Sequence, residues 1–291
     1  MIRFIKKTLG SVLFFFRLLF KEGLSNPFKS YKKAKRDNVA VILANGPSLN
    51  DFIKSLTEKL KQYEGADFFV VNDFVNDAAF SVLKPRHYVL SDPLFFWDTI
   101  YKERGNKVMN AIAGKVNWQM FLYIPNIYLK SHYLLPIKGN KNVTIIGFHS
   151  LHYTGLESLR HFYYKRGLGN GEFGSVVINA IYAALILGYK DIHLYGVDHT
   201  FFNGLLVNQD NVFCHRDEHF YTREVKLKPI LCHYFKGETR NYSVSYYLKE
   251  KASIFEGHEI MERFSRSIDA RILNCTECSM IDAYKRKKLE Q

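Results

Sequence analysis

The chain has 291 residues, of which 47% are hydrophobic and 15% aromatic, and its formal net charge is +13. This composition supports a sizeable folded core and excludes an intrinsically disordered chain. The charge sits at the ends, because residues 1–36 carry +9 and residues 284–291 carry +3, which leaves +1 for the body. A nearly neutral body argues against nucleic-acid binding and favours basic tails that meet an anionic surface.

Residues 1–36 begin with a basic amphipathic pattern. The apolar run between Lys7 and Arg17 is too short for a transmembrane helix. On a helical wheel, one side collects the basic positions Arg3, Lys6, Lys7, Arg17 and Lys21 with Gly10, and the other collects Ile5, Leu9, Val12, Leu13, Phe16, Leu19 and Phe20. The pattern predicts a helix that lies on an anionic membrane surface, with packing on the body or on a second chain as the alternatives.

The first predicted strand, 39–43, runs directly into Asn45, Gly46, Pro47 and Ser48. A β-branched run followed by this turn predicts a strand, a tight glycine turn and the start of a helix. Gly46 allows close approach of a ligand to the backbone, Pro47 is tolerated in a first helical turn, and Ser48 can cap the helix. Such a turn suits a phosphate group, although an ordinary strand–helix connection has the same composition.

Strand-like and helix-like segments then alternate along the chain. Strands are expected at 39–43, 68–71, 87–90, 143–146, 192–195 and 271–273, and helices at 51–63, 95–103 and 175–187. The last helix is apolar almost all round and stops at Gly188, so we expect it to be buried against a sheet. The alternation predicts an α/β fold, a Rossmann-like, doubly wound and mostly parallel sheet, as a single domain over 37–291.

Polar residues follow several of the predicted strands. They are Asn45, Gly46 and Ser48 after the first, Asn72 and Asp73 after the second, Ser91 and Asp92 after the third, and Gly196, Asp198 and His199 after the strand at 192–195. Ligands of such sheets bind beyond the carboxyl ends of the strands. The sequence therefore predicts a cleft there for the phosphate, ribose and base of a nucleotide.

The interval at about 200–260 breaks the alternation and gathers His and aromatic residues between turn signals, which predicts a lid over the cleft. A histidine with a pKa near neutrality can serve as general base for a sugar hydroxyl, so His199 and His219 are candidates, with Asp198 and Tyr221 beside them. Cys214, His215 and His219 have a spacing that a zinc ion could use, and Cys275 and Cys278 form a single C-x-x-C pair, but neither set is complete, so no metal is expected.

Three blocks resemble bacterial sialyltransferases of glycosyltransferase family 42 and related surface-polysaccharide and flagellin glycosylation proteins. They are the Asn-Gly-Pro-Ser-Leu turn at 45–49, the Val-Val-Asn-Asp stretch at 70–73, and the segment 181–198, which ends in Gly-Tyr-Lys-Asp-Ile-His-Leu-Tyr-Gly-Val-Asp. The C-terminal stretch 264–282 is similar too. The resemblance covers most of 39–200 and 264–282.

The resemblance implies an inverting, metal-independent transferase that uses a CMP-activated sialic acid and a glycan or glycolipid acceptor. Asn45, Gly46 and Ser48 would contact the nucleotide, and Asn72 the donor sugar. Gly174 and Ser175 would lie near the cytosine or the sugar carboxylate, and Asp198 below the nucleotide. His199 and Thr200 occupy positions where the family has aromatic residues. His219, His233 and His258 are all candidates for the position of the family's base.

The expected setting is a cytoplasmic protein, peripheral on the inner membrane, that acts in lipopolysaccharide or capsule synthesis. The few cysteines of this chain suit a reducing compartment. A UDP- or GDP-sugar donor, a pterin diphosphokinase-like enzyme that uses ATP and Mg²⁺, and a non-enzymatic nucleotide- or lipid-binding protein are the alternatives. No nucleic-acid partner is expected, and the oligomeric state, including a homo-oligomer, stays open.

Overall fold

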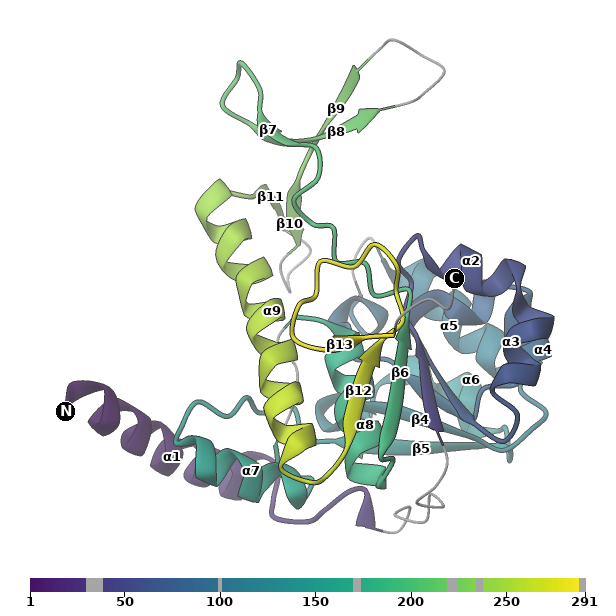
Figure 1. The fold of residues 1–291 in the computed structure, drawn as a ribbon, viewed down its shortest axis with the longest axis horizontal. Helices are drawn as coiled ribbons and strands as arrows, with labels where there is room; N and C mark the ends of the chain where they lie inside the picture. The colour runs from purple at the N-terminus through teal and green to yellow at the C-terminus, as the bar shows by residue number, and fades with distance from the viewer. Residues whose placement is uncertain (30–38, 99–100, 170–173, 219–224, 234–237, 288–291) are drawn as a thin grey trace.

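The computed structural model describes residues 1–29, 39–98, 101–169, 174–218, 225–233 and 238–287. Its centre is an eight-stranded sheet in the order β13-β12-β6-β1-β2-β3-β4-β5, in which all neighbouring strands are parallel (Figure 1). The strands are β1 (Val39–Leu43), β2 (Asp67–Val71), β3 (His87–Val89), β4 (Met120–Pro125), β5 (Val143–Phe148), β6 (Asp191–Tyr195), β12 (Arg271–Asn274) and β13 (Lys285–Arg286).

Both faces of this sheet are covered by helices. In β1, Ala40 and Ile42 join one hydrophobic core together with α8 and α9, whereas Val41 and Leu43 join a second core together with α2 and α5. A strand that is buried on both faces has a continuous apolar sequence, as β1 does. The α/β class and the doubly wound parallel sheet predicted from the sequence are confirmed.

The helices confirm one prediction and correct two. They are α1 (Ile2–Lys21), α2 (Leu49–Lys54), α3 (Leu56–Gln62), α4 (Ala79–Leu83), α5 (Lys102–Lys115), α6 (Leu135–Lys138), α7 (Glu157–Lys165), α8 (Val176–Leu187) and α9 (Val244–Arg266), with short 3₁₀ turns η2 (Asn72–Asn76), η3 (Pro93–Phe95), η4 (Asn126–Tyr128) and η5 (His132–Leu134). The predicted helix α8 is buried from Val177 to Leu187 and ends at Gly188, whose φ is 97°.

The helix predicted over 95–103 is wrong, and the one predicted over 51–63 is split at Ser55. Phe95 ends the turn η3, which Asp92 begins by accepting a hydrogen bond from the Leu94 N–H, and the next helix, α5, starts only at Lys102. Strand β4 was missed, because a short apolar run that ends in a proline does not distinguish a strand from a buried helical turn.

The order of the strands fixes where a ligand can bind. From β1 the chain builds β2, β3, β4 and β5 outward on one side, and then returns through α8 to place β6 on the other side of β1. The boundary between β1 and β6 is therefore the point where the strand order reverses. In open α/β sheets, ligands occupy the crevice beyond the carboxyl ends of the strands at this point.

Residues between β6 and β12 form two small antiparallel sheets and a long helix. One sheet consists of β7 (Leu205–Val207), β8 (Phe213–Glu218) and β9 (Val225–Pro229), and the other of β10 (Leu231–His233) and β11 (Thr239–Asn241). The β7–β9 sheet projects from the body beyond the start of α9, and β10 and β11 lie between that sheet and the body (Figure 1). The interval 200–260 thus holds these two sheets and most of α9, whose Ile254 and Ile260 belong to the main core.

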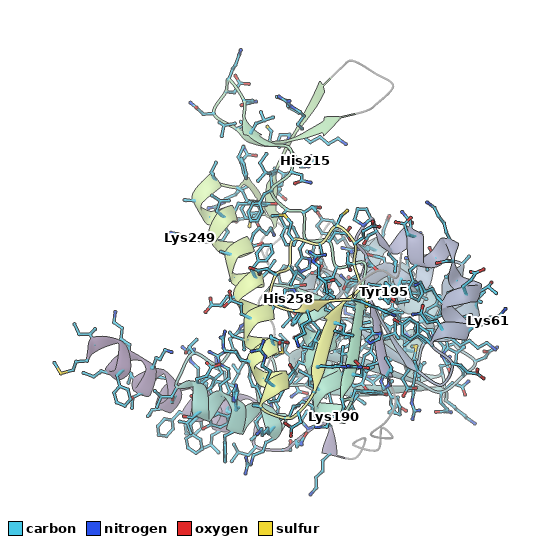
Figure 2. All side chains as sticks on the ribbon, in the orientation of Figure 1. Lys61, Lys190, Tyr195, His215, Lys249 and His258 are labelled. Carbon is cyan, nitrogen blue, oxygen red and sulfur yellow. The ribbon has the colours of Figure 1, made fainter. Side chains whose placement is uncertain are left out.

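The N-terminal helix α1 packs on the body through one narrow stripe. Ser11, Phe14 and Leu18 are its buried residues. Among the described helices, none combines the length and the low charge needed to cross a bilayer. Figure 2 shows the side chains of the described residues, with α1 extending from one end of the body.

Candidate nucleotide pocket

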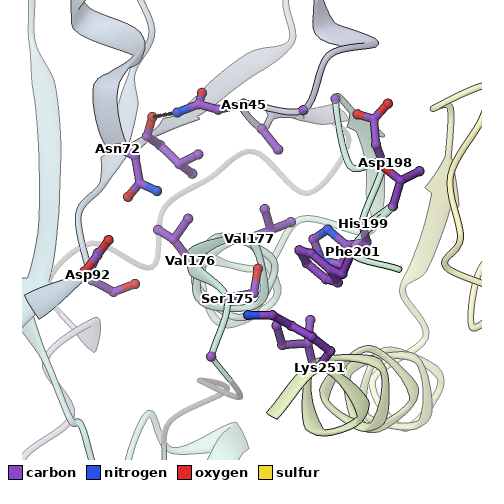
Figure 3. A pocket seen from close by; sticks show the side chains of 18 of the residues that line it. Asn45, Asn72, Asp92, Ser175, Val176, Val177, Asp198, His199, Phe201 and Lys251 are labelled. Atoms are coloured by element: carbon purple, nitrogen blue, oxygen red, sulfur yellow. Dashed lines mark hydrogen bonds between the residues drawn. The ribbon is translucent and has the colours of Figure 1, made fainter. Parts of the chain in front are cut away.

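A cavity of ≈ 540 Å³ opens at the carboxyl ends of β1 and β6, the reversal point of the sheet (Figure 3). Its volume falls in the range of small-molecule sites. It is lined by Ala44, Asn45, Gly46, Pro47, Val71, Asn72, Ser91, Asp92, Pro93, Gly174, Ser175, Val176, Val177, Gly196, Asp198, His199, Thr200, Phe201, Lys251 and Ile254. Two walls face each other across it, one built from the strand ends and the other from α8 and α9.

Two glycines let the ends of β1 and β6 touch in the first wall. The Gly46 N–H donates to the Gly196 carbonyl over 2.8 Å. A Cβ atom on Gly46 would lie 1.9 Å from Asp198 Oδ2, and one on Gly196 would lie 2.6 Å from the Ala44 carbonyl oxygen. Gly196 also has a φ of 68°, which a side chain would disfavour. Neither position can carry a larger residue without moving the wall.

Asp198 ties these two turns together. Its carboxylate accepts from the Ser48 backbone N–H over 3.2 Å and from the Ser48 hydroxyl over 2.8 Å. Asp198 is buried, so these bonds replace water that the carboxylate has lost. The Ser48 hydroxyl makes no cap on α2, contrary to the sequence expectation, and Ser48 does not line the pocket. Asp198 and Ser48 therefore stabilise the two turns that form this wall.

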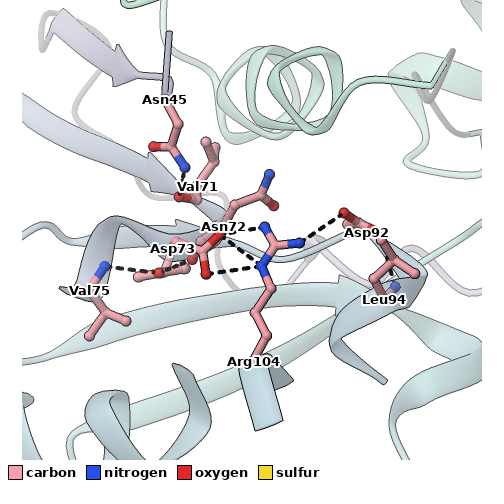
Figure 4. Close-up of polar contacts among 9 residues, drawn as sticks. Asn45, Val71, Asn72, Asp73, Val75, Asp92, Leu94 and Arg104 are labelled. Atoms are coloured by element: carbon pink, nitrogen blue, oxygen red, sulfur yellow. Dashed lines mark hydrogen bonds and ion pairs between the residues drawn. The ribbon is translucent and has the colours of Figure 1, made fainter. Parts of the chain in front are cut away.

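The neighbouring strand ends are held by Arg104, which reaches over from α5 (Figure 4). Its Nε donates to the two Asp73 carboxylate oxygens over 3.2 and 3.0 Å, and its Nη1 lies 4.0 Å from Asp92 Oδ2. Asp73 is therefore turned to Arg104 and is absent from the pocket lining. Asp92 does line the pocket, and burial raises the pKa of its carboxyl.

Two asparagines complete the first wall. The Asn45 amide donates to the Val71 carbonyl over 3.3 Å, which joins the ends of β1 and β2. Asn72 has a φ of 50°, a left-handed conformation that Asn tolerates better than most residues. Among the described residues, its buried Oδ1 has no hydrogen-bond partner. Asn72 lines the pocket, but a ligand would reach this oxygen only after the side chain rotates toward the cavity.

The second wall begins with the N-terminus of α8. Gly174 and Ser175 lead into it, and Val176 and Val177 form its first turn at the pocket. The first N–H groups of a helix have no partner within it, and Ser175 supplies no side-chain cap to them. These N–H groups and the helix dipole give this side of the pocket a positive electrostatic character.

Lys251 of α9 places an ammonium group close to Ser175, where it is ion-paired with Glu250 (Figure 3). Its Nζ lies 2.7 Å from Glu250 Oε1 and 5.2 Å from the centroid of the Phe201 ring. Sequence reasoning missed Lys251. The signal was present, because Lys251, Ile254, Phe255 and His258 recur with the i, i+3, i+4 and i+7 spacing of one helical face.

His199 closes the pocket next to Lys251. It has a φ of 52°, uncommon for a residue other than glycine, and such conformations are often kept at functional sites. Burial, with a smaller contribution from Lys251, lowers the pKa of His199 to about 4. Its Nε2 lies 3.0 Å from Nε2 of His258, and Nδ1 of His258 lies 2.9 Å from the Tyr284 hydroxyl. His199 is thus a neutral ring whose Nε2 is hydrogen-bonded to His258.

Most residues predicted for the site meet at this pocket. Those that line it are Asn45, Gly46, Pro47, Asn72, Ser91, Asp92, Gly174, Ser175, Gly196, Asp198 and His199, whereas Ser48 and Asp73 support it from outside. His219 and Tyr221 lie outside the described residues. Within the described ranges, no group of three or more His, Cys, Asp or Glu side chains could hold a metal ion.

Comparisons with known proteins give a likeness to a solved structure. No family model and no curated protein matches the chain. A solved structure, the MAf glycosyltransferase of Magnetospirillum magneticum AMB-1, is similar with a TM-score of 0.46 and 15% sequence identity. The likeness covers 86% of this chain and 33% of that one, so this chain spans about a third of the length of the bacterial protein.

Proposed function

We propose that this protein is a glycosyltransferase that binds a nucleotide-sugar donor in the pocket between β1, β6, α8 and α9. The observation that carries the proposal is the polarity of the second wall, where the α8 N-terminus and Lys251 lie together at the reversal point of the sheet. Backbone N–H groups and an ammonium group are the partners that a nucleotide phosphate requires. The first wall offers the shape, and Asn72, which lines the pocket, offers a side-chain amide for the rest of the ligand.

The donor class that fits this proposal is a CMP-activated sugar of the sialic acid type. Such a donor carries one phosphodiester and one carboxylate, and both are anions that the second wall would attract. Two acidic side chains, Asp198 and Asp92, also line the pocket. Both already accept hydrogen bonds from the protein: Asp198 from Ser48, and Asp92 from the Leu94 N–H. The sequence resemblance to family 42 sialyltransferases supports the same donor, and a UDP- or GDP-sugar is the competing choice.

The reaction would be a single displacement with inversion. An acceptor hydroxyl oxygen attacks the anomeric carbon, the bond from that carbon to the phosphate oxygen breaks, and CMP leaves with the electron pair. A general base takes the hydroxyl proton, for which His219 and His199 are the candidates. The α8 N–H groups and Lys251 would stabilise the charge that develops on the leaving phosphate, the largest contribution that fixed donors make to such a step.

The biological setting belongs to the same proposal. We place the enzyme on the cytoplasmic side of the inner membrane, where it would add a sugar to lipopolysaccharide or capsule precursors. The sequence resemblance and the basic N-terminal segment support this setting. The proposal needs no resident metal, since the charge of the leaving group is assigned to protein groups.

The test is calorimetric binding of CMP, CDP, UDP, GDP and ATP to the purified protein, each with and without EDTA. Selective CMP binding that EDTA leaves unchanged supports the proposal and leads to a transfer assay with CMP-sialic acid and galactoside acceptors. Selective UDP or GDP binding replaces the donor class. Binding of ATP that requires Mg²⁺ would instead support a diphosphokinase, and the absence of binding would contradict the enzyme proposal.

A further inference from the structure

The N-terminal helix presents an apolar face that the rest of the chain leaves uncovered. On its inner side, the Ser11 hydroxyl lies 2.7 Å from the Tyr153 hydroxyl and accepts from the Leu156 N–H over 3.0 Å. The Phe14 ring packs edge-on against Tyr153 and Tyr163, with both centroid distances at 4.9 Å. These contacts attach α1 to the body along one side only.

A second attachment fixes the end of α1. The Glu22 carboxylate accepts from the Ser150 hydroxyl over 2.7 Å and from the Ser150 N–H over 2.9 and 3.0 Å. It also lies 2.9 Å from His149 Nδ1. Because both side chains of this pair are almost completely buried, the contact is shielded from water and salt. The helix therefore keeps one fixed orientation on the body.

The outer side of α1 is the apolar side of the helical wheel. Ile2, Ile5, Leu9, Val12, Leu13, Phe16, Leu19 and Phe20 are between 43% and 80% exposed. A contiguous apolar face of this size on a folded protein marks a surface that contacts a partner or a membrane. On α7, which lies beside α1 (Figure 1), Leu159 and Phe162 are exposed as well.

The charges of α1 decide between these partners. The helix contains no acidic residue, and the exposed Lys6 and Arg17 flank the apolar face, next to Leu13 on the wheel. A contact between two copies of this face would find no acidic group on α1 to pair with these charges. An anionic lipid surface attracts them by about 1 kcal/mol each while it accepts the apolar side chains. We propose that the outer face of α1 binds the surface of an anionic membrane and so holds the whole body in one orientation there.

The experiment measures co-sedimentation of the full-length protein with vesicles of phosphatidylcholine alone or mixed with phosphatidylglycerol. The wild type should bind the anionic vesicles, and the combined variant Leu9→Ser, Leu13→Ser and Phe16→Ser should lose at least about tenfold in affinity. A matched control is Val82→Ser, Ile127→Ser and Leu135→Ser, which removes apolar side chains that are at least as exposed at other sites. The control should bind like the wild type.

Two results would overturn this proposal. One is equal vesicle binding by the α1 variant and the wild type. The other is a wild type that stays in the supernatant and elutes as a dimer, while the α1 variant elutes as a monomer, since the face would then bind a second copy. Neither result depends on the activity of the pocket.

A second inference rests on the buried chain from His199 through His258 to Tyr284. His258 and Tyr284 are buried. Each of the four polar atoms that link the three side chains has one hydrogen-bond partner among them. Burial lowers the pKa of His258 well below its ordinary value, so this ring is neutral and carries one proton. The direction of the hydrogen bonds is therefore decided by where that one proton sits.

The Tyr284 hydroxyl settles the direction. Among the described residues, its only hydrogen-bond partner is His258 Nδ1. If His258 Nδ1 carried the proton, the hydroxyl proton would be buried without an acceptor, which costs about 1–3 kcal/mol. In the favoured arrangement, Tyr284 donates to His258 Nδ1 and His258 Nε2–H donates to Nε2 of His199. The proton of neutral His199 is then on Nδ1.

We infer that His258 and Tyr284 are positioning residues that make His199 present an N–H donor to the pocket. If the proposed function holds, His199 then donates a hydrogen bond to the leaving phosphate, and the general base is a different group.

The experiment is long-range ¹H–¹⁵N NMR on protein labelled with ¹⁵N-histidine and without nucleotide, with His199→Gln and His258→Gln used to assign the two rings. We expect a protonated Nδ1 for His199 and a protonated Nε2 for His258. In Tyr284→Phe, which keeps the ring but removes the donor, the preference for these tautomers should weaken, so that the opposite tautomers become populated. A merely structural role of Tyr284 would lower thermal stability without moving the tautomers.

A protonated Nε2 on His199 in the wild type would overturn the inference, as would an unchanged tautomer in Tyr284→Phe. Because the spectra are recorded without a donor sugar, the tautomer result does not depend on the outcome of the nucleotide titrations. A failure to bind CMP would therefore contradict the proposed function and leave the tautomer result intact.

Discussion

The two walls of the pocket differ in how their polar groups are used. In the wall at the ends of β1 and β6, hydrogen bonds are made within the protein, as between Asp198 and Ser48. In the wall of α8 and α9, the N–H groups at the start of α8 lack a side-chain cap and Lys251 reaches the cavity. The comparison teaches that a polar residue at the pocket can serve the protein's own structure: in the proposed complex, the first wall would set the shape of the pocket and the second would supply its positive charge.

The strongest test of the shaping wall is Gly46→Ala. The new Cβ would collide with Asp198 Oδ2, so we expect both loss of nucleotide binding and a decrease of at least about 2 kcal/mol in the free energy of unfolding. Urea denaturation and calorimetry measure the two effects. Gly114→Ala is the matched control, because its Cβ would meet open space within α5 and alanine should slightly stabilise the helix.

The charge-supplying wall is tested by Lys251→Met. Removal of an ammonium group from a bound phosphate should weaken nucleotide binding by about 10- to 100-fold, and the loss of the ion pair with Glu250 should lower the free energy of unfolding by about 1 kcal/mol. Lys249→Met is the control, since Lys249 lies two positions away on α9 and is exposed outside the pocket. Equal affinities of the two variants would remove Lys251 from the binding site.

The buried His199 predicts a pH dependence of stability. Its pKa is lowered to about 4 in the folded protein and is near 6.5 in the unfolded chain, so the unfolded state binds more protons between these values. The free energy of unfolding should therefore fall as pH decreases from about 6.5 to about 4, by about 2 kcal/mol at pH 5. The dependence of the free energy of unfolding on pH should be weaker in His199→Gln. It should be unchanged in the control His132→Gln, which replaces an imidazole outside the pocket.

The smallest effect on binding is expected from Ser48→Ala. The lost hydrogen bond to Asp198 should lower the free energy of unfolding by about 1 kcal/mol. Nucleotide affinity should stay within about threefold of the wild type, because this hydroxyl does not reach the cavity. A larger loss of affinity would mean that Ser48 contacts the ligand and that the two walls are not separate in function.

Local sequence patterns were sufficient where a residue's role depends on its own neighbours. The strand 39–43, its glycine turn and the apolar helix that stops at Gly188 could all be read from a few consecutive residues. The β1 and β6 ends could be placed together because parallel strands align their carboxyl ends.

Other roles depend on partners far away in the chain. Asp73 looked like a ligand-binding residue, but Arg104, 31 residues later, takes its carboxylate. Lys251 belongs to a helix that local turn signals had concealed within the lid interval. The link between His199 and His258 joins residues 59 positions apart, and no local pattern predicts such a pair.

The docking of α1 has a consequence for the order of synthesis. Its partners Ser150 and Tyr153 follow Glu22 and Ser11 by 128 and 142 residues. At the usual pace of translation, this apolar helix leaves the ribosome on the order of ten seconds before the surface that receives its inner side exists. During that interval all of its faces are uncovered, so the nascent chain must be shielded by a chaperone or reach a bilayer while the body is still being made.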